Sequence, residues 1–368
     1  MTRGVDYFIP YVSGIGSSAV LLDIAARVRA PFTLLSVRPA EVILTDSATE
    51  RLLQTARQTG AAMVYADYYA RKADGTTLRH PAIDYQPGSL RDDFDFGNVW
   101  LIDTGLFRQW AEKAKDSTWK YAALYDLRLF LSRQGTIFHL NELLYTEAET
   151  DSRASGVRQF DYVNPANRDV QIEMESVVTA HLKAVGAWVD TTNAIAVDFD
   201  EQPFANEASV VIPVFNRART IADAVGSALQ QQTDFAFNVI VVDNHSTDGT
   251  TEILNKLSAD PRLVHIVPER TDLGIGGCWN EAVNDSRCGR FAVQLDSDDL
   301  YSSAASLQRI VDTFRRENAA MVIGAYRMCD FSLNTLPPGI IDHREWTDGN
   351  GPNNALRING LGAPRAFF

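Results

Sequence analysis

The chain has few of the residues that mark secreted or membrane-spanning proteins. It contains only 3 cysteines, Cys278, Cys288 and Cys329, an odd number without the spacing of a disulfide framework or a zinc site. We therefore expect free thiols that pack as small side chains in a reducing cytoplasm. No apolar run is long enough to cross a membrane, and the start, "MTRGVDYFIPYVSG", has no apolar core of signal-peptide length. The sequence predicts a cytoplasmic protein, with peripheral association at the inner face of the membrane left open.

Positive charge is also scarce. The 34 lysines and arginines are outnumbered by 47 aspartates and glutamates, which gives a formal net charge of -13. Proteins that bind nucleic acid carry clustered Lys and Arg to displace counterions, so no nucleic-acid partner is expected. An anionic ligand would need local help from a metal ion or from backbone amides.

Two parts of the chain resemble each other in sequence. The segment "GIGGCWNEAVNDSRCGRFAVQL" from Gly274 resembles "GIGSSAVLLDIAARVRAPFTLL" from Gly14. Downstream, "SLQRIVDTFRRENAAMVIGAYRM" from Ser306 matches "ATERLLQTARQTGAAMVYADYYA" from Ala48, and the final "GLGAPRAFF" sits where "DFGNVWLID" from Asp95 sits in the first copy. The sequence therefore predicts two offset copies of one α/β unit.

The two copies are complementary in extent. The second has an additional front, in which apolar strands alternate with helix-period segments as in a mostly parallel sheet, whereas the first has a rear portion at 104–150. The second copy ends on an apparent strand at Phe368, and we expect a C-terminal truncation there. The predicted domains are a degenerate unit at 1–150 that lacks the front, a helical connector and linker at 151–206, and at 207–368 a unit that has the front but is truncated at its rear.

Polar side chains follow three predicted strands of the second copy. Ligands of open parallel sheets bind beyond the carboxyl ends of the strands, so these side chains should line one crevice. Closely spaced carboxylates repel one another, and hard oxygen ligands without nearby His or Cys suit Mg²⁺ or Mn²⁺, which share their coordination shell with substrate phosphates. The residues are, strand by strand, Pro213 to Asn216, then Asp243 and Asn244, then Asp296, Asp298 and Asp299.

Four motifs in order resemble those of the family 2 glycosyltransferases, which have a GT-A fold. They are "VVIPVFNR", "VIVVDNHSTDGT", "GIGGCWNEA" and "LDSDD", over about residues 207 to 301. The resemblance implies an α/β fold of two GT-A-like, Rossmann-like units, each with a mostly parallel sheet, joined by a helical linker. It also implies a nucleotide-sugar donor, a Mn²⁺ or Mg²⁺ cofactor and transfer with inversion at the anomeric carbon.

The resemblance also implies roles for the residues that would hold the nucleoside. Pro213 and Phe215 resemble the positions that hold the base and ribose, and Asp243 with Asn244 those that read the base. The family often has a second Asp where Asn244 stands. An amide can both donate and accept a hydrogen bond, so the base stays open, with a UDP-sugar favoured and a dTDP-sugar as the alternative.

A second group of positions would serve the diphosphate and the metal. Gly276, Gly277 and Asn280 resemble the turn and helix start near the diphosphate, where small residues allow close approach and helix amides favour anions. Asp296 and Asp298 resemble the catalytic Asp-x-Asp pair, with Asp298 as metal ligand and Asp296 near the ribose or the metal. The general base of the family lies beyond the position matching Phe368.

The first copy lacks these features. "LLSVRPAE" from Leu34 stands where "QLDSDD" stands in the second copy, and Ala123 and Leu124 replace the acidic pair of the family. His139 is expected to be structural rather than a relic of a metal-contacting histidine. Other acidic stretches are interpreted as surface loops: "RDDFDFGN" from Arg91, and Asp342, Glu345 and Asp348.

The sequence therefore predicts an inverting, metal-dependent glycosyltransferase of hexosyl or N-acetylhexosaminyl type. It would move a sugar from a nucleotide-diphosphate donor to a glycan or lipid-linked acceptor in bacterial surface polysaccharide synthesis, an assignment by family analogy. The main alternative is a noncatalytic scaffold that binds nucleotide sugar or glycan. A nucleotidyltransferase is a weaker alternative, because no glycine- and basic-rich triphosphate loop stands near the first strand of the second copy.

Overall fold

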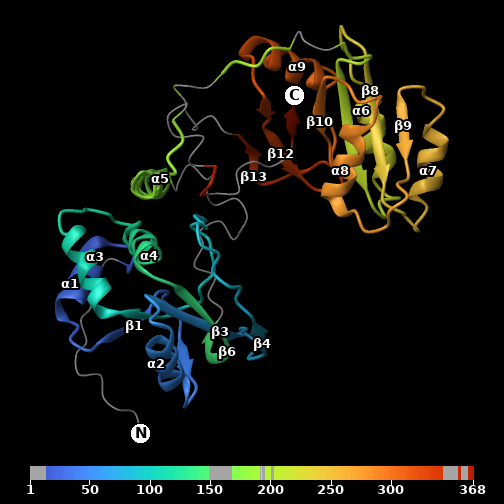
Figure 1. The fold of residues 1–368 in the computed structure, drawn as a ribbon. Coiled ribbons are helices and arrows are strands. Elements are labelled where there is room, and N and C mark those ends of the chain that lie inside the picture. The colour runs from blue at the N-terminus through green and yellow to red at the C-terminus, as the bar shows by residue number, and fades with distance from the viewer. Residues whose placement is uncertain are drawn as a thin grey trace. The chain divides into compact units, whose positions relative to one another are not determined.

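The computed structural model divides the chain into two compact units, each described here by itself (Figure 1). Unit 1 comprises Met1–Thr191 and Arg344–Asn359, and unit 2 comprises Thr192–His343 and Gly360–Phe368. The residues that the structure describes are 14–148, 168–190, 192, 195–199, 203–342, 355–357 and 364–368. The predicted acidic residues Glu345 and Asp348 lie outside them.

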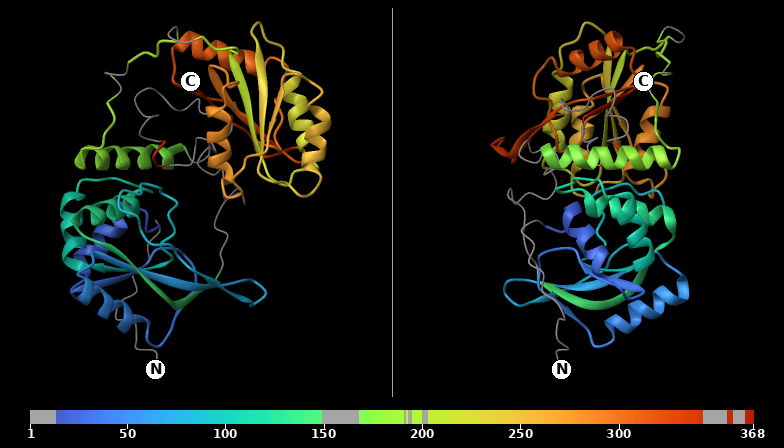
Figure 2. Two further views of the ribbon diagram at one scale, coloured as in Figure 1. Left: turned by 45° about the vertical axis from the view of Figure 1, so that its right-hand side comes forward. Right: turned by 90° about the vertical axis from the view of Figure 1, so that its left-hand side faces the viewer.

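Unit 1 is a mixed sheet with helices on both faces. The strand order is β1-β5-β3-β6-β2, with β4 paired to β3. The strands are β1 (Phe32–Ser36), β2 (Val42–Leu44), β3 (Met63–Arg71), β4 (Thr77–His80), β5 (Val99–Asp103) and β6 (Ile137–Ala148). The helices are α1 (Ser18–Arg27), α2 (Ala48–Thr59), α3 (Thr104–Lys113), α4 (Ala123–Gln134) and α5 (Arg168–Ala184). Helices α1, α3 and α4 cover one face of the sheet and α2 the other (Figures 1 and 2), and apolar clusters lie beneath each set.

The expectation of a mostly parallel sheet is wrong for unit 1. Only β3 and β6 are parallel among its pairings, and β1, β2, β4 and β5 all run antiparallel to their neighbours. The reason is that β5, "VWLID", is buried on both faces along most of its length, so its apolar run carries no information on direction.

Helix α5 lies in the segment for which a connecting helix was expected, and it packs within unit 1. Its Val177, Val178 and Leu182 join the apolar cluster that α4 contributes to. The carboxylate of Glu173 accepts hydrogen bonds from the backbone N–H groups just before α4, including that of Tyr121 at 2.8 Å. These amides have no partner inside α4, so Glu173 satisfies the start of that helix.

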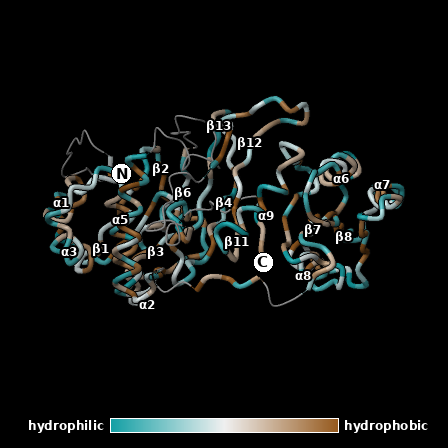
Figure 3. The backbone as a smooth tube through the Cα atoms, turned by 90° about the horizontal axis from the view of Figure 1, so that it is seen from above, coloured by the Kyte–Doolittle hydropathy of each residue, from teal (hydrophilic) through white to brown (hydrophobic). Residues whose placement is uncertain are grey.

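Unit 2 has a sheet of order β11-β14-β10-β7-β8-β9 and a separate two-stranded sheet of β12 and β13. The strands are β7 (Ala208–Val214), β8 (Phe237–Asp243), β9 (Leu263–Ile266), β10 (Phe291–Gln294), β11 (Met321–Ile323), β12 (Tyr326–Cys329), β13 (Thr335–Ile341) and β14 (Arg365–Phe367). The helices are α6 (Ile221–Leu229), α7 (Thr250–Leu257), α8 (Gly274–Asn284) and α9 (Ser306–Glu317). Strands β7 to β10 are mutually parallel, as predicted, and the apolar residues of β7 and β8 are brown in Figure 3. Helices α6, α7 and α9 cover one core and α8 the other.

The two units share one pattern of strand pairing. In unit 1, β5 runs antiparallel between β1 and β3, and in unit 2, β14 runs antiparallel between β10 and β11. Leu34 pairs with Leu101 in the first ladder, and Val293 pairs with Ala366 in the second. Two copies of one unit would produce this correspondence.

Candidate functional site

The loops that follow β7 and β8 are joined by a set of hydrogen bonds. The backbone N–H of Asn216 donates to Ser246 Oγ at 2.9 Å, and Asn216 Oδ1 accepts from the N–H of Thr247 at 2.7 Å. The N–H of Arg217 donates to Thr250 Oγ1 at 2.8 Å. Asn216 has a positive φ of 53°, which an asparagine tolerates better than most residues. The structure therefore fixes these two loops side by side at the carboxyl edge of the sheet.

Asp243, the last residue of β8, is fully buried and is used inside the fold. Its Oδ1 accepts from the N–H of Ser246 at 2.9 Å and its Oδ2 from Thr251 Oγ1 at 2.5 Å. His265 Nε2 lies 3.6 Å from Oδ2. Burial opposes ionisation, but these hydrogen bonds outweigh it and hold the pKa of Asp243 below its ordinary value. This geometry favours a role for Asp243 in shaping the turn.

Asn244, the next residue, has an unused acceptor. Its backbone N–H donates to the carbonyl of Val214 at 2.9 Å, which holds the residue against β7. Its Oδ1 is buried and has no hydrogen-bond partner among the residues that the structure describes. A buried acceptor without a donor is costly, so this atom is suited to receive a hydrogen bond from a ligand.

Pro213 and Phe215, at the end of β7 and just past it, differ in exposure. Pro213 is buried within β7 and pairs with Val242, so it belongs to the core. Phe215 is 54% exposed, just past the strand. An exposed aromatic ring beside a buried amide acceptor can stack on a planar base.

The glycines of α8 are placed at its first turn. Gly274 begins the helix with a positive φ of 58°, and Gly276 is exposed with open space where a Cβ would stand. A Cβ on Gly277 would come within 2.6 Å of Leu273 Cβ, so its small size serves packing. Asn280 is exposed one turn further on.

Three carboxylates follow β10. Asp296 is partly buried and its Oδ1 accepts from Gln294 Nε2 at 2.7 Å. The side chain of Asp298 is 46% exposed, and its Oδ2 lies 3.7 Å from Arg217 Nε. Asp299 is exposed as a whole residue, but the protein around its carboxyl group partly desolvates that group. That partial burial, with the charges of Asp296 and Asp298, raises the pKa of Asp299 to about 6.

These carboxylates fit a divalent ion that takes its other ligands from a substrate. Among the described parts of the chain, no three His, Cys, Asp or Glu side chains are arranged to hold a metal ion. Mg²⁺ and Mn²⁺ are bound through one or two carboxylates together with phosphate oxygens and water, so a complete protein cage is not required. Desolvation is the main cause of the raised pKa of Asp299, and the repulsion from Asp296 and Asp298, which adds to it, would be relieved by a cation at this place.

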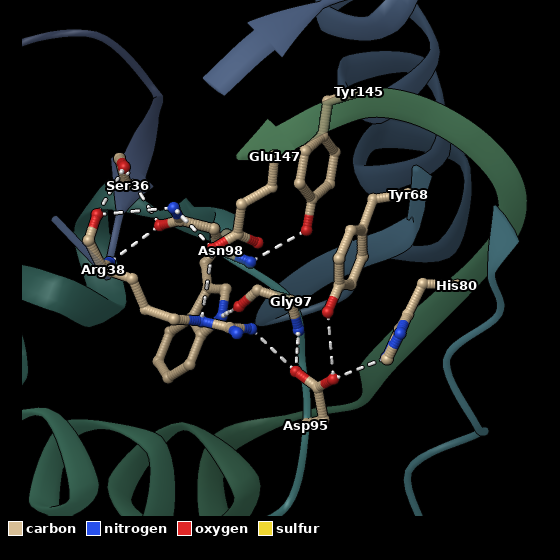
Figure 4. A network of polar contacts seen from close by, with 10 residues as sticks. Ser36, Arg38, Tyr68, His80, Asp95, Gly97, Asn98, Tyr145 and Glu147 are labelled. Carbon is tan, nitrogen blue, oxygen red and sulfur yellow. Dashed lines mark hydrogen bonds and ion pairs between the residues drawn. The ribbon is translucent and has the colours of Figure 1, made fainter. Parts of the chain in front are cut away.

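Unit 1 has an arginine network at the corresponding strand end. Arg38, just past β1, forms an ion pair with Asp95 at 2.7 Å, and its Nε lies 3.9 Å from Glu147 Oε1 (Figure 4). Asp95 also accepts from Tyr68 Oη at 3.2 Å and contacts His80 Nε2 at 2.9 Å. Arg38 lies in the segment "LLSVRPAE", which the sequence comparison aligns with "QLDSDD" of unit 2.

His139 of unit 1 is engaged on both ring nitrogens. Its Nε2 lies 2.8 Å from Asp67 Oδ1 and its Nδ1 lies 2.7 Å from Asp84 Oδ1, while its ring stacks on Tyr65. Ala123 is buried at the start of α4. Neither residue is open to a ligand.

Sequence reasoning missed the partners of the acidic motif. The motifs assign no role to Arg217 or Gln294, which contact Asp298 and Asp296, or to Arg365, which donates to Gln294. Arg217 follows Asn216 directly, so a basic residue beside the predicted crevice was a usable signal. Gln294 is the one polar residue at the end of an apolar strand, a pattern that also occurs in structural positions.

Comparisons with known proteins agree on the class of unit 2. Residues 209–362 match the family model described as "Glycosyl transferase family 2". Chondroitin synthase of Escherichia coli is 28% identical over 249 residues, covering 66% of this chain and 32% of that protein. The putative teichuronic acid biosynthesis glycosyltransferase TuaG of Bacillus subtilis is 35% identical over 93 residues, covering 25% of this chain and 36% of that protein. The chain thus spans about a third of the length of these relatives.

Two solved structures are also similar over part of the chain. S. aureus TarS 1-349 in complex with UDP-GlcNAc has 28% identity and a TM-score of 0.29, covering 32% of this chain and 33% of that chain. The mannosyltransferase PcManGT from Pyrobaculum calidifontis, in complex with GDP-Man and Mn²⁺, has 22% identity and a TM-score of 0.29, covering 45% of each chain.

No helix in the described ranges is long and apolar enough to cross a membrane.

Proposed function

Because residues 209–362 match the family 2 glycosyltransferase model, we propose that this chain transfers a sugar from a nucleotide-diphosphate donor to a glycan or lipid-linked acceptor. The observation that carries the proposal is the carboxyl edge of unit 2. There the unpaired Oδ1 of Asn244 and the carboxylates of Asp296 and Asp298 stand at the ends of strands in one sheet. Surface polysaccharide synthesis is the proposed setting, since relatives bear the names chondroitin synthase and teichuronic acid glycosyltransferase.

The nucleoside is proposed to bind between Phe215 and Asn244. The exposed ring of Phe215 stacks on the base, and Asn244 Oδ1 accepts a hydrogen bond from the N–H edge of a uracil or thymine. Asp243 holds the turn that presents Asn244. A UDP-sugar or a dTDP-sugar satisfies this arrangement, and the preference for UDP rests on the resemblance.

The diphosphate is proposed to lie between α8 and the acidic motif. The open space at Gly276 lets a ligand approach the first turn of the helix, where free amides and the helix dipole favour an anion. Asp298 would hold Mn²⁺ or Mg²⁺, with Arg217 as a nearby cation that balances its charge until the ion binds. When bound, such an ion neutralises charge that develops on a diphosphate leaving group. Inversion at the anomeric carbon is part of the proposal that rests on the resemblance.

Unit 1 is proposed to be a noncatalytic copy of the same unit. The shared antiparallel ladder supports a common origin, and the Arg38 network supports loss of the metal motif. Helix α5 is proposed to connect the two copies. Its packing on α4 makes it part of unit 1 rather than a free linker.

A thermal-shift panel tests the proposed function. The protein is mixed with UDP, dTDP, GDP or CMP, each with Mn²⁺, Mg²⁺ or EDTA. A nucleotide at a hundred times its dissociation constant should stabilise the fold by roughly 2.7 kcal/mol. We expect a shift with UDP or dTDP that needs the metal, is lost in Asp298→Ala and is kept in Asp312→Ala, which removes an exposed carboxylate on α9. No shift with any nucleotide would contradict the proposal and favour the noncatalytic scaffold.

A further inference from the structure

A buried glutamine links the last strand of the sheet to the acidic motif. Gln294 ends β10 and is only 3% exposed. Its Nε2 donates to Asp296 Oδ1 at 2.7 Å, and its Oε1 accepts from Arg365 Nε at 2.9 Å. Arg365 is the first residue of β14, so residues 71 positions apart meet through one amide.

The chemistry of the two partners fixes the orientation of this amide. A guanidinium only donates hydrogen bonds, and a carboxylate only accepts them. The opposite orientation of the Gln294 amide would set its NH₂ group against Arg365 and its oxygen against Asp296. Both contacts would then be repulsive, so one orientation remains.

The backbone around Gln294 is held on both sides. Strand β10 pairs with β7 in parallel, where Gln294 lies opposite Val211, and with β14 in antiparallel, where Val293 lies opposite Ala366. The N–H of Leu295 continues the ladder to Val211 O at 3.1 Å. A side chain that is buried on such a strand has little freedom, so it can hold its partner in one place.

The hydrogen-bonded chain from Arg365 through Gln294 to Asp296, called the relay here, engages one oxygen of Asp296 and leaves the other open. Asp296 Oδ1 is taken by Gln294, whereas Oδ2 accepts no hydrogen bond from the residues that the structure describes. An arginine in direct contact could engage both oxygens of a carboxylate in a bidentate pair. The neutral amide therefore lets Arg365 act on Asp296 while half of the carboxylate stays available.

We propose that Gln294 and Arg365 are positioning residues that hold Asp296 for the nucleotide. The inference rests on the proposed function of the same site. Neither residue touches the donor, and both act through the carboxylate. Without the relay, Asp296 would sample several rotamers, and binding would have to order it each time.

Calorimetric titration with UDP in the presence of Mn²⁺ tests the relay. Gln294→Met keeps the length of the side chain and removes both hydrogen bonds, and we expect about tenfold weaker UDP binding. Arg365→Met should weaken UDP binding severalfold, whereas Arg365→Lys should restore it to near the wild-type affinity, because an ammonium can still donate to Gln294 Oε1. Rescue by lysine separates positioning from simple packing.

The matched control is Gln231, another buried glutamine of unit 2. Its Nε2 donates to the carbonyls of Ser227 and Ser303 at 3.1 and 2.9 Å, and its Oε1 accepts from the N–H of Leu307 at 2.9 Å. Gln231→Met should lower stability against urea while its UDP affinity stays at the wild-type value. Gln294→Met should lower the affinity for UDP, and its loss of stability should be no larger than that of Gln231→Met.

The outcomes separate the relay from the function. Wild-type affinity in Gln294→Met, or equal losses of affinity in Gln294→Met and Gln231→Met, would overturn the relay and leave the glycosyltransferase proposal standing. If Gln294→Met does not fold, equal affinities of Arg365→Met and Arg365→Lys would overturn it. Failure of the wild-type protein to bind UDP, dTDP, GDP or CMP with Mn²⁺ would contradict the proposed function, and the relay with it.

Discussion

Arg357 forms a buried ion pair with Asp92, 265 positions away in the sequence, with Arg357 Nη1 2.5 Å from Asp92 Oδ2. Arg357 is completely buried, its Nη2 donates to Gln171 Oε1 at 2.8 Å, and its carbonyl accepts from the N–H of Asp92 at 3.4 Å. By its contacts Arg357 belongs to unit 1, although in sequence it lies within the family 2 match at 209–362. A residue inside the family 2 match thus belongs to unit 1 in the structure.

Removal of Arg357 should destabilise unit 1 in a pH-dependent way. Burial, only partly offset by Arg357, already raises the pKa of Asp92. Arg357→Ala removes the offset, so an unpaired buried carboxylate costs about 3 kcal/mol near neutral pH. Because the pKa of Asp92 is raised in the folded state, protonated Asp92 favours folding at low pH, and this contribution is lost as the pH rises through the folded pKa. The loss of stability in Arg357→Ala should therefore be larger at pH 7 than at pH 4. Urea unfolding of wild type and variant at both pH values measures it.

The control for this ion pair is the double variant Arg357→Met with Asp92→Leu. It removes both charges and leaves apolar groups, which should recover much of the stability that Arg357→Ala loses. A deficit in Arg357→Ala that is equal at pH 4 and pH 7 would show that Asp92 is not the group left unpaired.

Asn244 should matter for binding and not for folding. Asn244→Ala removes a buried acceptor that has no partner in the described structure, so the stability of the unliganded protein should stay the same or rise. The affinity for UDP with Mn²⁺ should fall about tenfold, because a hydrogen bond to the base is lost. Calorimetry and urea unfolding of one preparation give both values.

The matched control for Asn244 is Asn238, whose amide is fully engaged. Asn238 Oδ1 accepts from Ser209 Oγ at 2.5 Å, and its Nδ2 donates to the carbonyl of Arg287 at 2.9 Å. Asn238→Ala should therefore lose stability and keep the UDP affinity. The reverse pattern in the two variants would remove Asn244 from the proposed base site.

Ionised Asp299 should lower the folding stability of the metal-free protein at neutral pH. Its pKa of about 6 lies above the ordinary carboxyl value, so its contribution to stability is complete below about pH 4 and is lost as pH rises through about 6. Asp299→Asn cannot ionise, so its Tm without metal should exceed that of wild type at pH 7.5 and equal it at pH 4. Saturating UDP with Mn²⁺ should reduce this gain, since a cation offsets the repulsion. A gain of the same size at both pH values would contradict the electrostatic explanation.

Unit 1 should be dispensable for nucleotide contact. Arg38→Met leaves Asp95 without its guanidinium partner and Glu147 without a nearby positive charge, so unit 1 should unfold at lower urea concentration. The affinity for UDP with Mn²⁺ should not change. Loss of affinity without loss of stability would place Arg38 in a nucleotide site and contradict a noncatalytic unit 1.

The parts predicted well from sequence are those set by local pattern. The buried runs of β7 and β8 and the glycine start of α8 have strong periodic or turn signals, and they lie where the sequence indicated. Because the strands are parallel, their polar ends come to one edge, so the candidate site followed from the order of the motifs. The sequence could not predict that Asp243 is hydrogen-bonded within the turn while Asn244 Oδ1 has no partner among the described residues. This difference depends on a tight turn in which His245 has a φ of 62°.

The parts that sequence could not provide are long-range pairings. The direction of β5 and β14 leaves no trace in their apolar residues. The relay through Gln294 needs Arg365 to lie on the neighbouring strand, and the Arg357 pair needs Asp92 from the other end of the chain. Such contacts are set by tertiary packing and have no periodic signal.

The position of the bound metal is the sharpest test of the proposed donor site. Crystals soaked with UDP and Mn²⁺ should be measured at the manganese absorption edge. We expect an anomalous peak about 2.2 Å from a carboxylate oxygen of Asp298, a distance typical of a hard divalent ion, with UDP extending from it to Asn244. A manganese peak away from Asp298, or UDP bound elsewhere with no metal at the acidic motif, would contradict the proposed donor site.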